Sequence, residues 1–286
     1  MGQMSLEIGY TRPKGQVFKW LGSKFKFAYT ITAYFPEQYN RYIEPFIGAG
    51  AMLATVAPEE GIAGDALAPL IEAWKILQED PEHLIEHYTT HFHEFVEAPK
   101  ETYARILSRY NETPNGPDLL VLTRTCYGGV VRFTKEGKMS TPSGMHKPMS
   151  IKTFRAVVHE WRERLKGTTF YHQSFEETMA MAKEGDLVYC DPPYIASQRI
   201  LYGAQSFQFQ RLLEVIESCK SRGVKVVLSI DGKKKSGKQK IALEVPDGLF
   251  EREHFVSCGA SMLRRFQKSG EKMKGEDVHD RLLLTW

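Results

Sequence analysis

The sequence is poor in cysteine and contains no long apolar run. Its 286 residues include four cysteines, none of which forms a C-x-x-C pair, and the nine histidines make no ligand-spaced group with them. We therefore expect no disulfide framework, no structural zinc site and no bound metal. No stretch approaches the ~18 consecutive apolar residues of a membrane span, and residues 1–19 lack the apolar core of a signal peptide. These absences predict a cytoplasmic protein without a membrane partner.

A strong excess of charge of one sign is also missing. The formal net charge is only +3, so the total charge does not by itself indicate a nucleic-acid partner, and the distribution of charge matters more. Apolar residues make up 42% of the chain and charged residues 26%, which is the balance of an ordinary globular protein. A chain of this length is expected to bury one large α/β core, alone or with a smaller inserted domain.

Strand and helix signals alternate at both ends of the chain but not in the middle. The expected strands are residues 41–46, 61–65, 168–171, 186–190, 224–230, 251–257 and 281–286. Alternation of this kind predicts a doubly wound, mostly parallel sheet, and the last two strands, with no helix expected between them, predict an antiparallel end. We expect the catalytic domain to comprise residues 1–78 and 165–286, with an inserted domain at residues 79–164.

The tetrapeptide Asp191-Pro192-Pro193-Tyr194 directly follows an expected strand. It should therefore project from the carboxyl end of the sheet, where open α/β sheets bind ligands. The two prolines fix the backbone and remove two amide donors, so the preceding carbonyls are held as acceptors. A carboxylate and a carbonyl together accept from an –NH₂ group, and an aromatic ring stacks on the base that carries it. The plain alternative is a strand-ending turn, and the neighbouring motifs argue against it.

A glycine turn follows the first expected strand. Glu44-Pro45-Phe46-Ile47-Gly48-Ala49-Gly50 allows a tight turn and a close approach of a ligand to the backbone at Gly48 and Gly50. Asp65 ends the next strand, where an acidic residue accepts hydrogen bonds from ribose hydroxyls. The full G-x-G-x-x-G pattern is absent, which disfavours a dinucleotide. Trp20 and Lys24 flank a Gly-Ser turn, and they either line a pocket for a zwitterionic ligand or are a buried tryptophan and a solvated lysine.

A basic segment lies inside the expected insert. The Lys-Glu-Gly-Lys turn at residues 135–138 lies between β-branched runs and predicts a hairpin. The stretch from Arg124 to Lys147 carries five basic residues against one acid, Glu136. A basic hairpin with aromatic residues is typical of an element that reads a groove or grips phosphates. The alternative is a solvated charged hairpin without a partner.

These motifs together resemble the Dam-type (α-class) DNA adenine N6-methyltransferases. The resemblance rests on Trp20 to Lys24, Glu44 to Gly50, the strand end at Asp65, Cys126 to Arg132, and residues 191–194. It covers most of the chain, and the insert precedes the catalytic tetrapeptide, as in the α arrangement. One departure lies at Gly129, which follows Tyr127-Gly128 where family members often carry Asn-Gly.

The resemblance implies a class I S-adenosylmethionine-dependent methyltransferase fold with a target-recognition insert. It implies S-adenosylmethionine as the methyl donor, double-stranded DNA as the substrate, and a cognate restriction endonuclease as a partner to consider. The implied cofactor-binding residues are Trp20, Lys24, Phe46, Gly48, Gly50, Asp65, Phe175 and Asp191. The implied DNA-binding residues are Arg124, Tyr127, Gly128, Arg132 and Lys138. Asp191, Pro192 and Tyr194 would carry catalysis on an adenine flipped out of the duplex.

Three other readings stay open at this point. An N4-cytosine methyltransferase would use the same tetrapeptide, because cytosine presents a similar amine. A methyltransferase acting on RNA or on a protein amide would use the same cofactor. A DNA-binding protein with a catalytically silent methyltransferase fold would keep the sheet without the activity, and the intact residues 191–194 argue against it.

Overall fold

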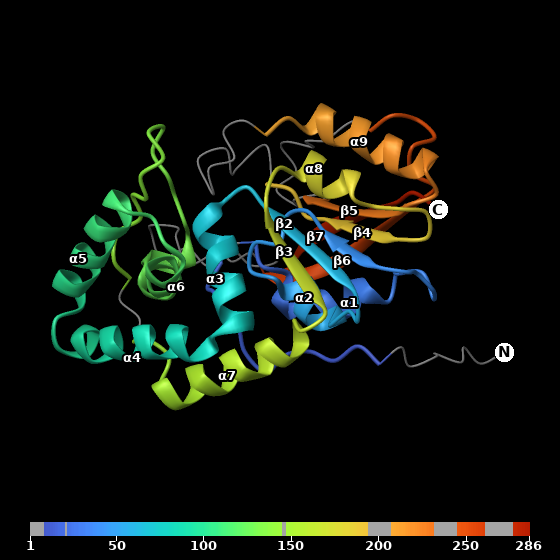
Figure 1. The fold of residues 1–286 in the computed structure, drawn as a ribbon. Helices are drawn as coiled ribbons and strands as arrows, with labels where there is room; N and C mark the ends of the chain where they lie inside the picture. Colours follow the sequence, from blue (N-terminus) through green and yellow to red (C-terminus); the bar gives the residue numbers. More distant parts are fainter. Residues whose placement is uncertain (1–8, 21, 145–146, 194–206, 232–244, 261–276) are drawn as a thin grey trace.

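The computed structural model describes residues 9–20, 22–144, 147–193, 207–231, 245–260 and 277–286, which fold around one central sheet (Figure 1). The strands are β1 Tyr42–Glu44, β2 Gly61–Asp65, β3 Thr168–His172, β4 Leu187–Cys190, β5 Lys225–Asp231, β6 Arg252–Ala260 and β7 Asp277–Leu284. The α-helices are α1 Ala28–Thr32, α2 Ala51–Val56, α3 Ala68–Glu79, α4 Pro81–Glu97, α5 Pro99–Glu112, α6 Gly116–Thr125, α7 Ile151–Arg164, α8 Phe175–Ala180 and α9 Phe209–Ser221. Two 3₁₀ turns are η1 Lys24–Lys26 and η2 Tyr127–Gly129.

The sheet formed by the described strands has the order β3-β2-β1-β4-β5-β7-β6. Strands β1 to β5 are parallel to one another, whereas β7 runs antiparallel to both β5 and β6. The chain winds outward from β1 through β2 to β3 and then returns to β4 on the other side of β1. The carboxyl ends of β1 and β4 therefore flank the switch point at which open α/β sheets bind ligands. This order confirms the predicted class I methyltransferase fold with its antiparallel end.

Helices cover both faces of the sheet because successive strand side chains point to opposite sides. On one face Ile43, Val188 and Leu228 pack with the apolar residues of α8 and α9. On the other face Tyr42 and Tyr189 pack with α1, α2 and α3. Figure 1 shows α8 and α9 on one side of the strands and α1 and α2 on the other. The protein is thus a three-layer α/β/α sandwich.

The helices of the expected insert extend one of these two layers. The apolar cluster on the α3 side continues without a break into the buried residues of α4, α5, α6 and α7. Trp161 of α7 stacks on Trp74 of α3 with ring centroids 5.5 Å apart, and Arg164 of α7 donates to the carbonyl of Ala54 in α2 at 3.1 Å. Helix α7 also packs on α4 of the expected insert, where Tyr88 stacks on Phe154 with ring centroids 3.9 Å apart, so α7 joins the insert to the catalytic layer. The domain division itself stays a prediction.

Local causes set the bounds of the insert helices. Helix α5 is separate from α4 because Pro99 lacks the amide proton that would continue α4 and instead begins α5. The segment 116–125 was not expected to be helical, yet it forms α6, which is buried along its whole length. A helix that is buried on all sides shows no amphipathic periodicity, so its sequence gives no periodic signal. Asn115 begins α6 by accepting from the amide of Asp118.

The predicted hairpin is confirmed at residues 132–140. Phe133 and Met139 form an antiparallel bridge, and the amide of Thr134 donates to the carbonyl of Lys138 at 2.8 Å. Gly137 closes the turn with φ +77°, a conformation that other residues rarely adopt. Figure 1 shows this hairpin as a narrow loop extending beyond α5 and α6.

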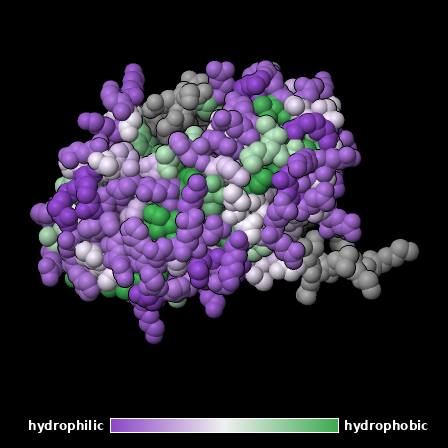
Figure 2. Space-filling view, in the orientation of Figure 1, coloured by the Kyte–Doolittle hydropathy of each residue, from purple (hydrophilic) through white to green (hydrophobic). Residues whose placement is uncertain are grey.

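The outer surface in the view of Figure 2 is mostly hydrophilic. Apolar residues on this face form small separated areas rather than one broad patch. Among the described helices none combines the length and the apolar character needed to cross a membrane.

Candidate active site

A pocket of about 390 Å³ opens at the carboxyl ends of β1, β2 and β4. Its volume lies within the ordinary range of small-molecule sites. It brings together every residue expected to bind the cofactor, namely Trp20, Lys24, Phe46, Gly48, Gly50, Asp65, Phe175 and Asp191. Pro192 and Pro193 also line it. Residues from five distant parts of the sequence therefore meet at the switch point of the sheet.

The glycine turn after β1 is held by Asp65 at the end of β2. The carboxylate of Asp65 accepts from the amide of Gly48 at 3.1 Å and from the amide of Leu67 at 3.0 Å. Gly48 has φ +45°, and a Cβ added there would lie 3.4 Å from Nε1 of Trp20. Gly50 has φ +63°, and its Cβ would lie 3.1 Å from the ring of Trp74. These two glycines are required by backbone conformation and packing as well as by any ligand.

Three phenylalanines form an aromatic wall on one side of the pocket. Phe46 stacks on Phe175 with centroids 5.3 Å apart, and Phe207 contacts both rings edge-on at 5.8 Å. Phe175 begins α8, whose N-terminus is fixed by a reciprocal capping box between Ser174 and Glu177. Phe207 was missed from the sequence, because it precedes α9 without any motif around it. The wall offers an apolar, flat surface for an aromatic ring.

A buried charge cluster lies at the pocket, whose lining includes Lys24, Glu44 and Asp191. The ammonium of Lys24, only 3% exposed, lies 2.9 Å from Oδ1 of Asp191 and 3.0 Å from Oδ2 of Asp280 on β7. Glu44 is also buried and accepts from the hydroxyl of Tyr42 at 3.0 Å. Burial, and after it the negative charge of Asp191, raise the pKa of Glu44 well above its usual value. Neither Asp280 nor Glu44 was expected to take part, and Asp280 carries no sequence signal.

The catalytic tetrapeptide is described only in part. Asp191, Pro192 and Pro193 follow β4 directly and line the pocket, as the sequence predicts. Tyr194 lies outside the described residues, so its expected stacking role stays a prediction. Cys190, the last residue of β4, points into the core under α8 and α9, and burial raises the pKa of its thiol well above the usual value.

Arg124 does not occupy the position expected of a DNA-binding residue. Its side chain is buried at 5% exposure, and its guanidinium donates to the carbonyls of Gln16 and Val17, both at 2.8 Å. It also lies over the ring of Phe154. A buried guanidinium bonded to main-chain carbonyls does not present its donors at the surface, so this arrangement gives no support to the expected DNA contact. Through these hydrogen bonds Arg124 holds the segment that precedes Trp20 against α6.

The other expected DNA-binding residues lie on or beside the hairpin. Arg132 and Lys138 are exposed on it, and Tyr127 is 45% exposed in the turn η2 that precedes it. Gly128 adopts φ +67° within η2. A Cβ at Gly129 would lie 3.0 Å from Cβ of Lys19, which places η2 beside the residue that precedes Trp20. The turn that carries Tyr127 therefore lies next to Lys19, which precedes the pocket residue Trp20.

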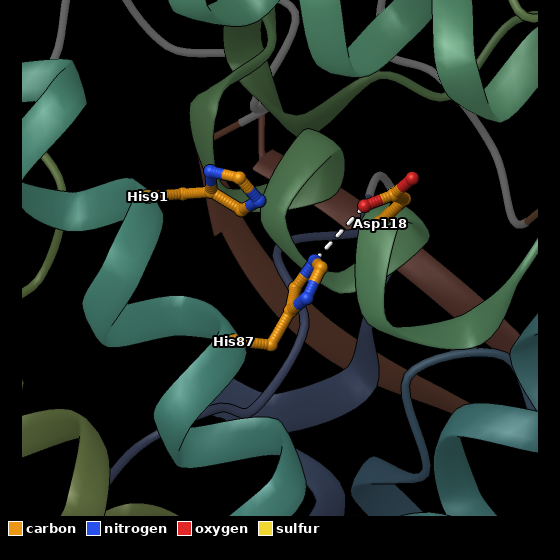
Figure 3. Close-up of side chains that lie close together, drawn as sticks. All are labelled: His87, His91 and Asp118. Atoms are coloured by element: carbon orange, nitrogen blue, oxygen red, sulfur yellow. Dashed lines mark hydrogen bonds and ion pairs between the residues drawn. The ribbon is translucent and has the colours of Figure 1, made fainter.

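A second polar cluster joins α4, α5 and α6. His87, His91 and Asp118 place three potential metal ligands within 4.8 Å of one another, an arrangement that the sequence did not predict (Figure 3). His87 bonds to Asp118 at 2.9 Å. The guanidinium of Arg109 pairs with both oxygens of Asp118 and contacts Nε2 of His91 at 3.1 Å. A side-chain cation thus already pairs with this group.

The sequence matches a known protein family over most of its length. Residues 20–257 match the family described as D12 class N6 adenine-specific DNA methyltransferase. The chain belongs to this family. The match covers most of the sequence and includes the pocket, the tetrapeptide and the hairpin. It confirms the resemblance that the motifs indicated.

Individual relatives agree with the family. The type II methyltransferase M1.LlaDCHI of Lactococcus lactis subsp. cremoris is 29% identical over 228 residues, which cover 74% of this chain and 79% of the relative. The DNA adenine methylase of Escherichia coli K12 is 25% identical over 226 residues, 74% of this chain and 78% of the relative. The DNA N-6-adenine-methyltransferase of Escherichia phage P1 is 28% identical over 231 residues, 76% of this chain but 30% of the phage protein.

Membership makes this chain an adenine-specific DNA methyltransferase, and the family implies S-adenosylmethionine as methyl donor. The N4-cytosine alternative, left open by the tetrapeptide alone, is not favoured. The silent DNA-binding alternative gains no support either, because the pocket retains its acidic and aromatic residues.

Proposed function

We propose that this enzyme transfers the methyl group of S-adenosylmethionine to the N6 amine of an adenine flipped out of duplex DNA, with Asp191 and the carbonyl of Pro192 as the acceptors that orient the amine. The observation that carries the proposal is the convergence of Asp191, the aromatic wall and Asp65 on one pocket at the switch point. Each of these groups matches one part of the two substrates.

The pocket fits the methyl donor in shape and charge. The wall of Phe46, Phe175 and Phe207 suits an adenine ring, and Asp65 at the end of β2 suits ribose hydroxyls. Asp65 already binds two backbone amides, and each carboxylate oxygen retains a further lone pair for a hydroxyl. The acidic side at Asp191 suits a sulfonium cation. When bound, this donor supplies an electrophilic methyl group on a positively charged sulfur.

The chain's own part in the reaction is orientation. Lys24 holds one oxygen of Asp191, and the carboxylate lines the pocket, where it would accept from the target amine. The two prolines keep the carbonyl of Pro192 in a fixed direction as a second acceptor. Two acceptors fix the amine nitrogen so that its lone pair points along the line of transfer. Placement of this kind, together with charge in a dry pocket, accounts for much of the rate enhancement in group transfer.

A covalent route through cysteine has no support in the geometry. Cys190 is adjacent to Asp191 in sequence, yet its thiol is fully buried on the opposite face of the sheet. Burial raises the pKa of Cys190, which disfavours the nucleophilic thiolate. Direct transfer to the amine therefore needs no enzyme-bound intermediate.

The hairpin is the proposed DNA-binding element. Arg132 and Lys138 place positive charge on an exposed hairpin that is long enough to enter a groove, and Tyr127 presents an aromatic ring in the turn before it. Gly128 shapes that turn. Arg124 is buried, so the proposed DNA contacts do not include it. A cytoplasmic location and a cognate restriction endonuclease stay predictions of the same proposal.

Substitution of Asp191 tests the proposal. Asp191→Asn keeps the size of the side chain and removes the negative charge, so we expect transfer of labelled methyl groups to DNA to fall about 100-fold or more. The modified nucleoside is identified after digestion of DNA methylated by the wild-type enzyme. N6-methyladenine is expected, and N4-methylcytosine would overturn the adenine assignment. A folded Asp191→Asn variant with near-normal transfer would refute the catalytic role.

A further inference from the structure

Asp280 is a buried carboxylate without a role in the reaction proposed above. It lies on β7, 89 positions after Asp191 in the sequence, and its side chain is 6% exposed. Strand β7 inserts between β5 and β6, and Asp280 points to the same face as Leu282 and Leu284 in the core. A carboxylate in such surroundings is costly unless it has a cationic partner. Its partner is Lys24, 3.0 Å away.

Lys24 has one positive charge, whereas the two carboxylates beside it carry two formal negative charges. One ammonium lies within 3.0 Å of two carboxylates, Asp191 and Asp280, so the formal charge of the three side chains is −1. Asp280 and Lys24 are almost fully buried, whereas Asp191 is 20% exposed and lines the pocket. The unbalanced negative charge is therefore directed toward the pocket. Burial favours the neutral form of the nearby Glu44, which then adds no second charge there.

Without Asp280 the net negative charge around Asp191 would be smaller. Lys24 would then pair with Asp191 without competition from the carboxylate of Asp280, and the ammonium would neutralise more of the charge that faces the donor. Charge–charge attraction at such short distances in a partly buried site is strong, so the loss would be felt by a cation in the pocket. Asp280, which maintains the negative charge of Asp191, therefore lies on β7 and belongs to none of the sequence motifs named above.

We infer that Asp280 is a positioning residue, which acts as the counter-ion of Lys24 and thereby leaves the negative charge of Asp191 available to the sulfonium of the methyl donor and to the target amine. The inference rests on the proposed function of Asp191. The antiparallel end of the sheet thereby takes part in the reaction. Asp280 acts through Lys24 and contacts neither substrate.

Two measurements on Asp280→Asn test this role. The variant keeps the side-chain volume and an oxygen that accepts from Lys24, so it is expected to remain folded. The single-turnover rate at saturating cofactor and DNA should fall roughly 10- to 100-fold, less than for a group that itself touches the transition state. In calorimetry, binding of the cationic S-adenosylmethionine should weaken about tenfold relative to binding of the uncharged-sulfur product S-adenosylhomocysteine. A merely structural role would weaken both ligands alike.

The matched control is Asp186→Asn. Asp186 is buried like Asp280 and pairs with a cation, Arg41 at 2.6 Å, but it lies before the first residue of β4, at the end remote from Asp191. The Asp186→Asn variant should have a lower free energy of unfolding than the wild type. Its ratio of affinities for S-adenosylmethionine and S-adenosylhomocysteine, and the single-turnover rate of its folded fraction, should stay unchanged. An unchanged ratio and rate in Asp280→Asn would overturn the inference.

A double-mutant cycle with Lys24→Met shows whether Asp280 acts through Lys24. In the Lys24→Met background Asp280→Asn should change the affinity ratio less than twofold, because the ammonium that it balances is gone. An equal effect in both backgrounds would overturn the inference. Failure of the proposed function is distinguishable, because in that case the wild-type enzyme itself would not methylate adenine.

Discussion

Glu44 is a carboxyl group buried at 2% exposure in the lining of the pocket. Burial raises its pKa well above the usual value in the folded protein, while in the unfolded chain the pKa is about 4.3. Its contribution to the free energy of unfolding is therefore fully present below that pH and is lost as pH rises toward the folded pKa.

Glu44→Gln should remove this pH dependence. Glutamine keeps an oxygen that accepts from Tyr42 and has no proton to lose. Urea unfolding at several values between about pH 5 and 8 should give a flatter dependence of the free energy of unfolding for the variant than for the wild type. Parallel curves for the two proteins would contradict the assignment.

Arg124 is expected to stabilise the fold rather than bind DNA. Arg124→Met keeps the length of the side chain and removes the donors to Gln16 and Val17, so the free energy of unfolding should fall by on the order of 2–3 kcal/mol. The slope of log Kd for DNA against log salt should stay at the wild-type value for the folded variant. A reduced slope would show that Arg124 contacts a phosphate after all.

At the scale of elements, the hairpin 132–140 is expected to contribute phosphate contacts. Lys138→Ala should weaken binding to all DNA sequences by a similar factor and reduce the salt slope by about 0.9. Lys166→Ala, an exposed lysine outside the hairpin, is the control. If both variants have the same slope as the wild type, Lys138 is a solvated residue without a phosphate partner.

The parallel strands and the site at their ends were predictable from the sequence. Short motifs follow β1, β2 and β4 directly, and the geometry of a parallel sheet brings their ends together, so Asp65, Gly48 and Asp191 could be placed in one pocket. The hairpin was predictable because its turn residues and β-branched runs give a local signal.

The remaining features depend on contacts between distant residues. Helix α6 is buried on all sides and lacks periodicity, and Arg124 within it looks like any other basic residue of the insert. Asp280 becomes part of the site only because β7 pairs with β5, more than 45 positions away in the sequence. His87 and His91 have helical i, i+4 spacing, but Asp118 joins them only through the packing of α6.

At the scale of the whole molecule, the shared core predicts cooperative unfolding. The apolar residues of α4, α5, α6 and α7 are continuous with those of α2, α3 and the sheet. Calorimetry should therefore show one transition, and circular dichroism and tryptophan fluorescence should follow the same curve. Separate transitions for the insert and the sheet would contradict this packing.

Trp161 is the sharpest test of that connection. Its indole stacks on Trp74 and donates to the carbonyl of Gly15 at 2.7 Å, so it links α7, α3 and the N-terminal segment. Trp161→Ala should lower the free energy of unfolding by about 3–5 kcal/mol and keep a single transition. Loss of the insert helices alone, with the sheet intact, would show two independent units.

The continuous core also bears on how new target specificities could be engineered. Exchange of residues 79–164 with a relative would cut through the stacked tryptophans and the Arg164 bond to α2, so most such chimaeras should misfold. Exchange of residues 127–140 would leave these contacts intact, because the hairpin extends from the molecule on the far side of α6. The exposed positions of the hairpin are thus the part of the insert that can be exchanged, whereas its buried residues Val131, Phe133 and Met139 belong to the shared core.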